Sequence, residues 1–168
     1  MSGSVDIFAK LPFPGLRSYE PKEQEMFFGR ERQLDELLRK LRSNRFLALV
    51  GNAGSGKSSL AKASLVPKLQ NGFSGQAGQN WRIAICRPGN NPIGNLSTQL
   101  AQQNVLHSDD KMDPNYPSVI ENTLRRGSLG IVEAYKNADV EKENLIIFVD
   151  QFEEIFRFSK KNTKAQEE

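Results

Sequence analysis

Short apolar runs alternate along this chain with stretches in which apolar residues recur at helical spacing. Residues 46–50 form a continuous apolar run that ends at a glycine, which is typical of a buried strand. Before this run, four leucines recur at i, i+3, i+4 and i+7 with charged residues between them, and they predict a helix that ends at 43–44: Leu34, Leu37, Leu38 and Leu41. Residues 58–66 are compatible with a second helix, which Pro67 should interrupt or kink.

The same alternation continues in the second half of the chain. Residues 81–86 and 145–150 predict two further strands, and the second of these ends in a carboxylate. Residues 93–105 and 117–135 predict helices, the latter with a break near its glycines, and the stretches 71–80 and 106–117 are typical of loops. Because strands alternate with helices throughout, the sequence predicts an α/β fold with a mainly parallel sheet.

The loop that follows residues 46–50 has the pattern G-x-x-x-x-G-K-[ST]. Its glycines allow positive φ and a close approach to a ligand, so that successive backbone N–H groups can converge on a phosphate. Lys57 would place a charge against the outer phosphates, and the Ser58 hydroxyl would take one position on Mg²⁺. The alternative is a glycine-rich turn with a chance lysine. Because a predicted strand and a predicted helix flank the loop, we expect a nucleoside triphosphate to bind Gly51, Asn52, Ala53, Gly54, Ser55, Gly56, Lys57, Ser58 and Ser59.

The aspartate that ends the last predicted strand is the second candidate for this chemistry. Ligands of parallel sheets bind at the carboxyl ends of the strands, and Gly51 and Asp150 both follow such apolar runs directly. Asp150 can hold Mg²⁺ through its water shell, opposite Ser58. An aspartate that only caps a strand end is the alternative.

The residue that would activate the attacking water is less clearly marked. Gln151 follows the aspartate directly, and a glutamine can orient water but cannot accept its proton. Glu153 and Glu154 come next, and either could reach back if the strand end bends into a helix. We favour Glu153 over Glu154; solvated charges at a helix start are the alternative.

Composition limits the number of domains and the class of protein. The 168 residues suffice for one domain, and the net charge of +3 comes from lysines and arginines spread along the chain, which is weak evidence for nucleic acid. The single cysteine, Cys86, excludes an internal disulfide and predicts a buried strand thiol, while His107 in a polar loop is expected to be solvated. Because we find neither a membrane-length apolar run nor a signal-peptide pattern, we expect a cytoplasmic protein.

Six segments together resemble the novel STAND NTPases, which are signal-transduction relatives of the AAA+ class: PFPGLRSYE, FFGRE, FLALVGNAGSGKSSL, WRIAICRPGNNP, LRRGSLG and LIIFVDQFEEIF. The resemblance implies a three-layer P-loop NTPase sandwich in which the loop is a Walker A motif and the strand before Asp150 a Walker B motif. It also implies that Phe28, Gly29 and Arg30 pack around adenine, and hence ATP rather than GTP. The residue types themselves are compatible with this role, because an aromatic pair can stack on a base and an arginine supplies charge. For Phe27, a buried side chain at a helix start is an equal alternative.

The resemblance also bears on domain organisation. Residues 1–21 should form an extended segment pinned by Leu11, Phe13, Leu16 and Tyr19, residues 22–158 the NTPase core, and residues 159–168 a polar tail. In the family's sheet a central strand with a polar sensor residue follows the Walker B strand, and lid and winged-helix domains come after it. We therefore expect an incomplete core from a longer protein, with weak or no hydrolysis of its own.

The resulting hypothesis is a Mg²⁺-dependent ATP-binding core of a STAND-type signalling switch, which hydrolyses ATP in the full-length protein. The resemblance implies self-association through this core and sensor and effector domains on the same longer chain; neither a membrane nor nucleic acid is indicated. Two alternatives stay open: an origin-recognition or AAA+-like DNA-associated ATPase, and a non-hydrolysing, nucleotide-dependent interaction module. Arg125 and Arg126 are candidates for an arginine finger in trans, although exposed helix arginines are far more common.

Overall fold

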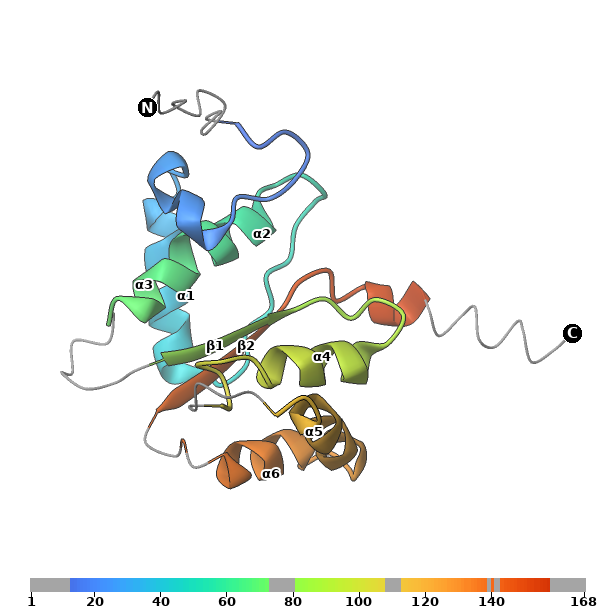
Figure 1. Ribbon diagram of the computed structural model, residues 1–168. Coiled ribbons are helices and arrows are strands. Elements are labelled where there is room, and N and C mark those ends of the chain that lie inside the picture. Colours follow the sequence, from blue (N-terminus) through green and yellow to red (C-terminus); the bar gives the residue numbers. More distant parts are fainter. Residues whose placement is uncertain (1–12, 73–80, 108–112, 139, 141–142, 158–168) are drawn as a thin grey trace, which may run out of the picture. The chain divides into compact units, whose positions relative to one another are not determined.

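The computed structural model describes residues 13–72, 81–107, 113–138, 140 and 143–157 (Figure 1). The described chain divides into two compact units, Met1–Phe73 and Ser74–Glu168. Together they give an α/β chain with a small parallel sheet, which agrees with the predicted class. The predicted tail at 159–168 and most of the loop at 71–80 lie outside the described residues.

In the first unit, all regular structure of the described residues 13–72 is helical. It begins with the 3₁₀ helix η1 (Pro21–Met26) and continues with α1 (Glu31–Ser43). After the loop come α2 (Lys57–Ser59), the π-helix η2 (Leu60–Leu65) and α3 (Val66–Gln70). Its buried apolar residues come from α1 and from the run of helix after the loop: Leu37, Leu38, Leu60, Ala61, Ala63, Leu65, Val66 and Leu69.

Helix α1 confirms the leucine pattern. Leu37 and Leu38 are buried, and charged residues occupy the outer face, where Glu36 and Lys40 form an i,i+4 ion pair at 3.0 Å. Asn44 ends the helix as predicted, because both its backbone N–H and its side-chain amide donate to the carbonyl of Lys40. The bond to a free carbonyl in the last turn stabilises this end of the helix.

The strand expected at 46–50 is not formed, and this prediction is wrong. The segment has no regular structure, and Phe46 and Val50 are 84% and 92% exposed. A continuous apolar run predicts a strand only where neighbouring strands bury it and pair with its backbone. Within described residues 13–72 there is no strand to do so.

The helix after the loop also differs from its prediction, because Pro67 does not interrupt it. Helical structure continues from Lys57 to Gln70, with Pro67 in the first turn of α3. A proline in a regular α-helix leaves the carbonyl four residues earlier without its donor and clashes with it. The π-helical register of the preceding residues Leu60–Leu65 changes which carbonyls are paired there, and thereby accommodates the proline.

The N-terminal segment is pinned by Tyr19, one of the four residues predicted to do it. Phe13 and Leu16 are exposed, and Leu11 lies outside the described residues. Tyr19 is half-buried, its ring packs against Phe27 with centroids 5.4 Å apart, and its backbone N–H donates to the Ser59 hydroxyl at 3.2 Å. Polar contacts as well as an aromatic pair therefore hold this segment, which apolar patterning alone could not reveal.

The second unit contains the sheet. Strand β1 (Trp81–Cys86) pairs in parallel with β2 (Asn144–Val149), in a register that joins Trp81 to Asn144 and Cys86 to Val149. Three helices lie in the described parts of the connection between the strands: α4 (Pro92–Leu100), α5 (Tyr116–Arg125) and α6 (Gly130–Asn137). A parallel pair requires such a crossover connection. Both predicted strands are confirmed.

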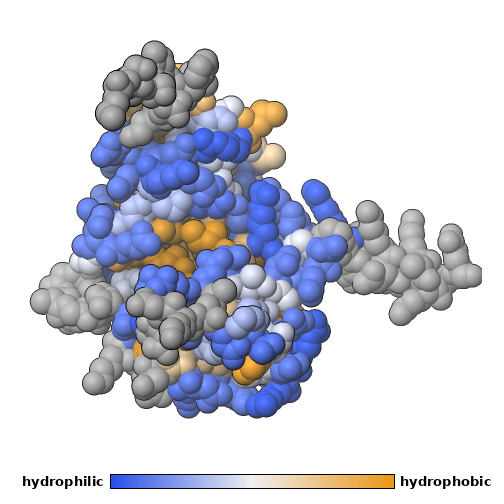
Figure 2. All heavy atoms as spheres, in the orientation of Figure 1, coloured by the Kyte–Doolittle hydropathy of each residue, from blue (hydrophilic) through white to orange (hydrophobic). Residues whose placement is uncertain are grey.

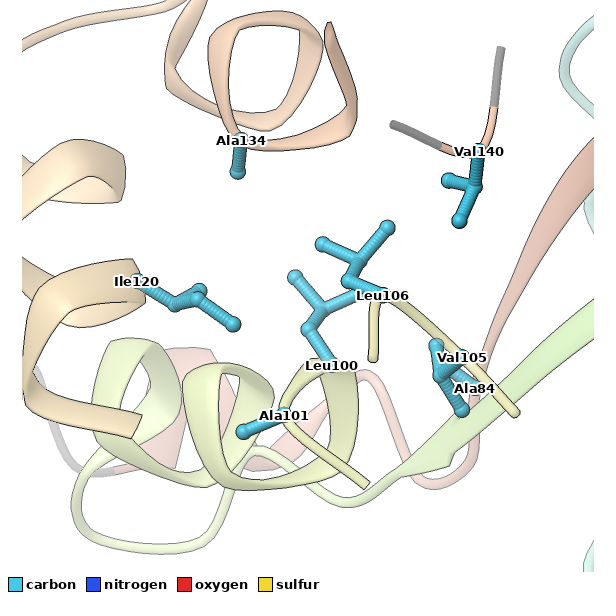
Figure 3. Packing of buried hydrophobic residues seen from close by; sticks show 8 residues of the cluster. All are labelled: Ala84, Leu100, Ala101, Val105, Leu106, Ile120, Ala134 and Val140. Carbon is cyan, nitrogen blue, oxygen red and sulfur yellow. The ribbon is translucent and has the colours of Figure 1, made fainter. Parts of the chain in front are cut away.

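A single apolar cluster fills the space between β1 and the three helices (Figure 3). Its side chains come from the strand, the helices and the segments that connect them, and they point toward one another: Ala84, Leu100, Ala101, Val105, Leu106, Ile120, Ala134 and Val140. Cys86 is buried as predicted, and burial raises the pKa of its thiol. The thiol is therefore protonated at neutral pH and unsuited to a nucleophilic role.

Helix α4 is shorter than its prediction, whereas α5 and α6 together cover the stretch predicted at 117–135. Helix α4 ends at Leu100 rather than 105, and Pro117 lies in the first turn of α5 instead of closing a loop. The break near the glycines is confirmed, since α5 ends at Arg125 and α6 begins at Gly130. His107 is half-buried against the ring of Tyr116 at 5.2 Å, so the expectation of a solvated histidine is wrong.

Candidate functional site

The phosphate loop of the first unit has the backbone that its glycines predict at two of three positions. Gly54 and Gly56 have φ of +76° and +82°, a region that other residues rarely adopt. Gly51 does not need this freedom, but a Cβ there would lie 3.2 Å from the Ser55 hydroxyl. Gly56 is directly followed by α2, so the loop turns into the helix at the residue where the motif requires it.

Lys57 closes the loop on itself. Its ammonium group donates to the carbonyls of Gly51 and Asn52, at 2.8 and 2.9 Å. The two carbonyls belong to the start of the loop and the lysine to its end, so the side chain spans the whole turn. This places a positive charge at the mouth of a loop whose other groups are mainly backbone, which is the environment an anion requires.

The loop is joined to the segment before α1. Arg30 donates from its guanidinium to the carbonyl of Ser55 at 3.2 Å, and the N–H of Gly29 donates to the carboxylate of Glu31 at 2.8 Å. Backbone hydrogen bonds, from the N–H of Glu31 itself and then from Gly29, lower the pKa of the Glu31 carboxyl. Phe28 is 81% exposed, and Gly29 has a positive φ of +81°. Of the three residues predicted to surround adenine, Arg30 therefore lies beside the phosphate loop, and the nearby Phe28 ring is accessible.

A groove of about 400 Å³ opens next to this loop within the first unit. Arg30, Leu37 and Lys40 line it from the side of α1, and residues 47–51 and 55–57 line it from the side of the loop. Large apolar side chains are also exposed in both units: Phe13, Leu16, Phe28, Phe46, Val50 and Phe152. Figure 2 shows apolar patches among mainly hydrophilic residues on one face of the molecule. The groove thus combines apolar walls with the charges of Arg30 and Lys57, a mixture typical of ligand pockets.

Ser59, the last loop residue predicted to bind nucleotide, contacts the N-terminal segment. It is buried, and its hydroxyl accepts the bond from Tyr19 described above. One helical turn later, Lys62 forms an ion pair with Glu20 at 3.3 Å. Sequence reasoning missed this pair of contacts, because neither the lysine nor the glutamate belongs to a recognised motif.

The second unit holds the other group of predicted residues. Asp150 directly follows β2, is only 4% exposed, and donates its backbone N–H to the Cys86 carbonyl at 2.9 Å. This bond continues the ladder between the strands by one residue. Asp150 therefore lies at the carboxyl end of the sheet, as the sequence predicts.

The residues after Asp150 turn sharply. Gln151 has a φ of +57°, unusual for a residue other than glycine, and a short helical turn follows at 154–157. Glu153 is exposed, whereas Glu154 is half-buried and accepts a hydrogen bond from the N–H of Gly89 at 2.9 Å. The strand end thus bends into a short helical turn, which was the condition for either glutamate to reach back. The Gly89 bond connects Glu154 to the segment after β1.

The structure therefore brings the predicted residues together in two groups. The loop residues join Arg30 in the first unit, and Asp150, Gln151 and Glu154 join the segment after β1 in the second. Sequence reasoning missed Arg87 and Gly89 of that segment. Their signal was the RPG sequence directly after a predicted strand, where loop residues of parallel sheets carry function.

The oxygen ligands in these groups suit Mg²⁺. Among the described residues no three His, Cys, Asp or Glu side chains cluster to hold a metal ion. Such a cluster is not needed, because Mg²⁺ keeps several waters and takes one or two protein oxygens together with phosphates. A serine hydroxyl at the first turn of α2 and the buried carboxylate of Asp150 are ligands of this kind.

One comparison with known proteins identifies a family for this chain. The family described as Novel STAND NTPase 1 matches residues 12–167, which is nearly the whole chain. The chain therefore belongs to the novel STAND NTPases. Searches among curated proteins and among solved structures gave no match.

Two further predictions concern membrane-spanning helices and an arginine finger. No helix in the described part of the chain is long and apolar enough to cross a membrane. The two candidate arginines each pair with a glutamate nearby: Arg125 with Glu121 at 2.7 Å and Arg126 with Glu133 at 2.5 Å. Intramolecular pairs of this kind are what ordinary helix arginines form, so nothing in their contacts marks them as arginine fingers.

Proposed function

We propose that this chain is the Mg²⁺-dependent ATP-binding core of a STAND-type signalling switch. The observation that carries the proposal is the loop from Gly51 to Ser59, whose positive-φ glycines and spanning lysine form a ready anion-binding turn. Membership of the STAND NTPases supports a nucleotide as the ligand. We retain the three-layer P-loop sandwich as the proposed complete fold.

Each predicted residue keeps a proposed role. The loop N–H groups and Lys57 bind the phosphates, and Phe28, Gly29 and Arg30 receive the base. Ser58 in the first unit and Asp150 in the second each remain a proposed ligand of Mg²⁺, which when bound neutralises the charge that develops on the phosphates. Glu153 and Glu154 remain the candidates for water activation.

The contacts around these two glutamates favour a second candidate function, binding without hydrolysis. Gln151 cannot accept a proton, and the Glu154 carboxylate already accepts from Gly89. Glu153 is accessible but is exposed to water. In this alternative the bound nucleotide organises an interaction module and dissociates without being hydrolysed.

Calorimetric titration with ATP, with and without Mg²⁺, tests the proposal. We expect saturable binding of ATP that weakens when EDTA removes the metal, and weaker binding of GTP. Release of phosphate from ATP, followed over hours, separates the two candidates: none is expected from the interaction module. A folded chain that binds neither nucleotide would contradict both.

The remaining proposals concern the longer protein. Self-association through this core, and sensor and effector domains on the same chain, are what STAND membership leads us to propose as partners. A cytoplasmic location is proposed on the same ground. Analytical ultracentrifugation with ADP and with ATP would test the association directly.

A further inference from the structure

An arginine lies over the candidate metal carboxylate. Arg87 follows β1 and Asp150 follows β2, and the parallel register places the two positions side by side at the carboxyl end of the sheet. The Arg87 Nε lies 3.7 Å from Asp150 Oδ2. The arginine side chain is 57% exposed and the aspartate side chain 4%, so the guanidinium approaches a buried carboxylate from the solvent side.

A second contact holds the guanidinium in this position. With the Gln151 amide in the orientation that satisfies both neighbours, its oxygen accepts from Arg87 Nη2 and its nitrogen donates to Glu154 Oε1. Glu154 in turn accepts from the N–H of Gly89, two residues after the arginine. A closed ring of contacts thus connects the turn after β1 to the turn after β2. The positive φ of Gln151 is the backbone conformation in which this ring occurs.

We propose that Arg87 acts as a cationic substitute for the metal, which Mg²⁺ must displace from Asp150. The inference rests on the proposed role of Asp150 as the metal carboxylate. A guanidinium and a hydrated divalent cation repel each other and seek the same oxygens, so they compete for one carboxylate. Because the arginine is largely exposed, it can swing into water when the metal arrives, at the modest cost typical of an exposed ion pair.

Arg87 is thus a positioning residue that keeps the site neutral and ordered before the metal binds. Its removal should strengthen metal binding, whereas removal of a phosphate-binding or purely structural arginine should weaken it or leave it unchanged. Whether metal binding becomes stronger or weaker when Arg87 is removed therefore distinguishes these roles. Arg87→Gln keeps the hydrogen-bonding capacity without the charge, and Arg87→Lys keeps the charge.

The test is titration of the whole chain with Mn²⁺ alone, followed by the loss of the free-ion signal in electron paramagnetic resonance. We expect Arg87→Ala and Arg87→Gln to bind about two- to fivefold more tightly than the wild type. Arg87→Lys should resemble the wild type, and adding Asp150→Asn should abolish the gain. Arg126→Ala is the matched control, because it frees another surface carboxylate, that of Glu133, and should change nothing.

Equal or weaker Mn²⁺ binding by both charge-removing variants would overturn the inference, as would a gain that survives Asp150→Asn. Circular dichroism establishes that each variant is folded, and Arg87→Gln carries the test if Arg87→Ala is not. No nucleotide is present in this experiment. Failure of ATP binding would therefore count against the proposed function, and an absent Mn²⁺ effect against the role of Arg87.

Discussion

The guanidinium of Arg30 donates a hydrogen bond to the backbone carbonyl of Ser55 across 3.2 Å. The two residues stand 25 positions apart in the chain. One belongs to the FGR segment before α1 and the other to the phosphate loop. The contact means that two motifs that are separate in the sequence form one structural unit, so a change in the first should be felt by ligands of the second.

Replacement of Arg30 by alanine should therefore weaken ATP binding about three- to tenfold, because the Ser55 carbonyl loses a charged donor and the loop loses a support. Calorimetry measures the affinity. Arg32→Ala is the control, since it removes the same charge from the exposed face of the adjoining helix. Equal affinities for both variants would show that the contact has no bearing on the loop.

Gly54→Ala tests the backbone of the loop itself. Alanine at a φ of +76° should reduce the free energy of unfolding by about 1–2 kcal/mol and also impair ATP binding, since the loop must distort. The matched control is Gly72→Ala, with a φ of +81° and, like Gly54, nothing within 4 Å of the new Cβ. This variant should lose similar stability but keep its ATP affinity. Impaired binding in both would mean that only stability is involved.

The stability of the N-terminal segment should depend on pH through Glu23. The Arg17 guanidinium, and after it the N–H of Glu20, hold the pKa of the Glu23 carboxyl at about 2, below its ordinary 4.5. A carboxyl whose pKa is lowered by folding stabilises the protein above pH 4.5, and this stabilisation is lost as the pH falls from 4.5 to 2.

Urea midpoints measured against pH check this. The wild type should exceed Glu23→Gln at pH 7, and the two curves should converge toward pH 2. Glu25→Gln, which removes an exposed carboxyl from the same 3₁₀ helix, should not show this gap. A gap that persists undiminished at pH 2 would assign the stabilisation to something other than the carboxylate.

The core of the second unit should depend on Leu100, which is fully buried within the cluster. Leu100→Ala should cost about 2–5 kcal/mol of unfolding free energy, from lost burial and a cavity. The same substitution at Leu129, which is 71% exposed, should cost less than about 0.5 kcal/mol. Chemical denaturation gives both values. Similar losses for both leucines would contradict the placement of this core.

Sequence patterns predicted the elements whose periodicity reflects local burial, and they failed where the structure depends on pairing or helical register. The leucines of α1 and the strands at 81–86 and 145–150 were predicted correctly, because their periodicity reflects burial inside their own unit. Residues 46–50 failed because an apolar run says nothing about whether a strand is there to pair with it. Pro67 failed because a change to π-helical register removes the conflict that local rules assume.

The candidate site shows the same division. The loop motif identified Gly56 and Lys57, since its spacing encodes a local turn, and the extra glycine at 54 also has a positive φ. Arg87 and its contact with Asp150 could not be predicted, because the contact arises from the register of two strands that are about sixty residues apart in the chain. Long-range pairing of this kind leaves no periodic trace in the sequence.

The most direct test of the central claim is ATP binding by the Lys57→Ala variant. We expect Mg²⁺-dependent, saturable binding by the wild type and its loss in the variant, because the variant lacks the charge that spans the loop. Lys68→Ala, an exposed lysine of α3 on the same run of helix, should bind as the wild type does. Undiminished binding by folded Lys57→Ala would contradict the account, since the nucleotide would then not be held by this loop.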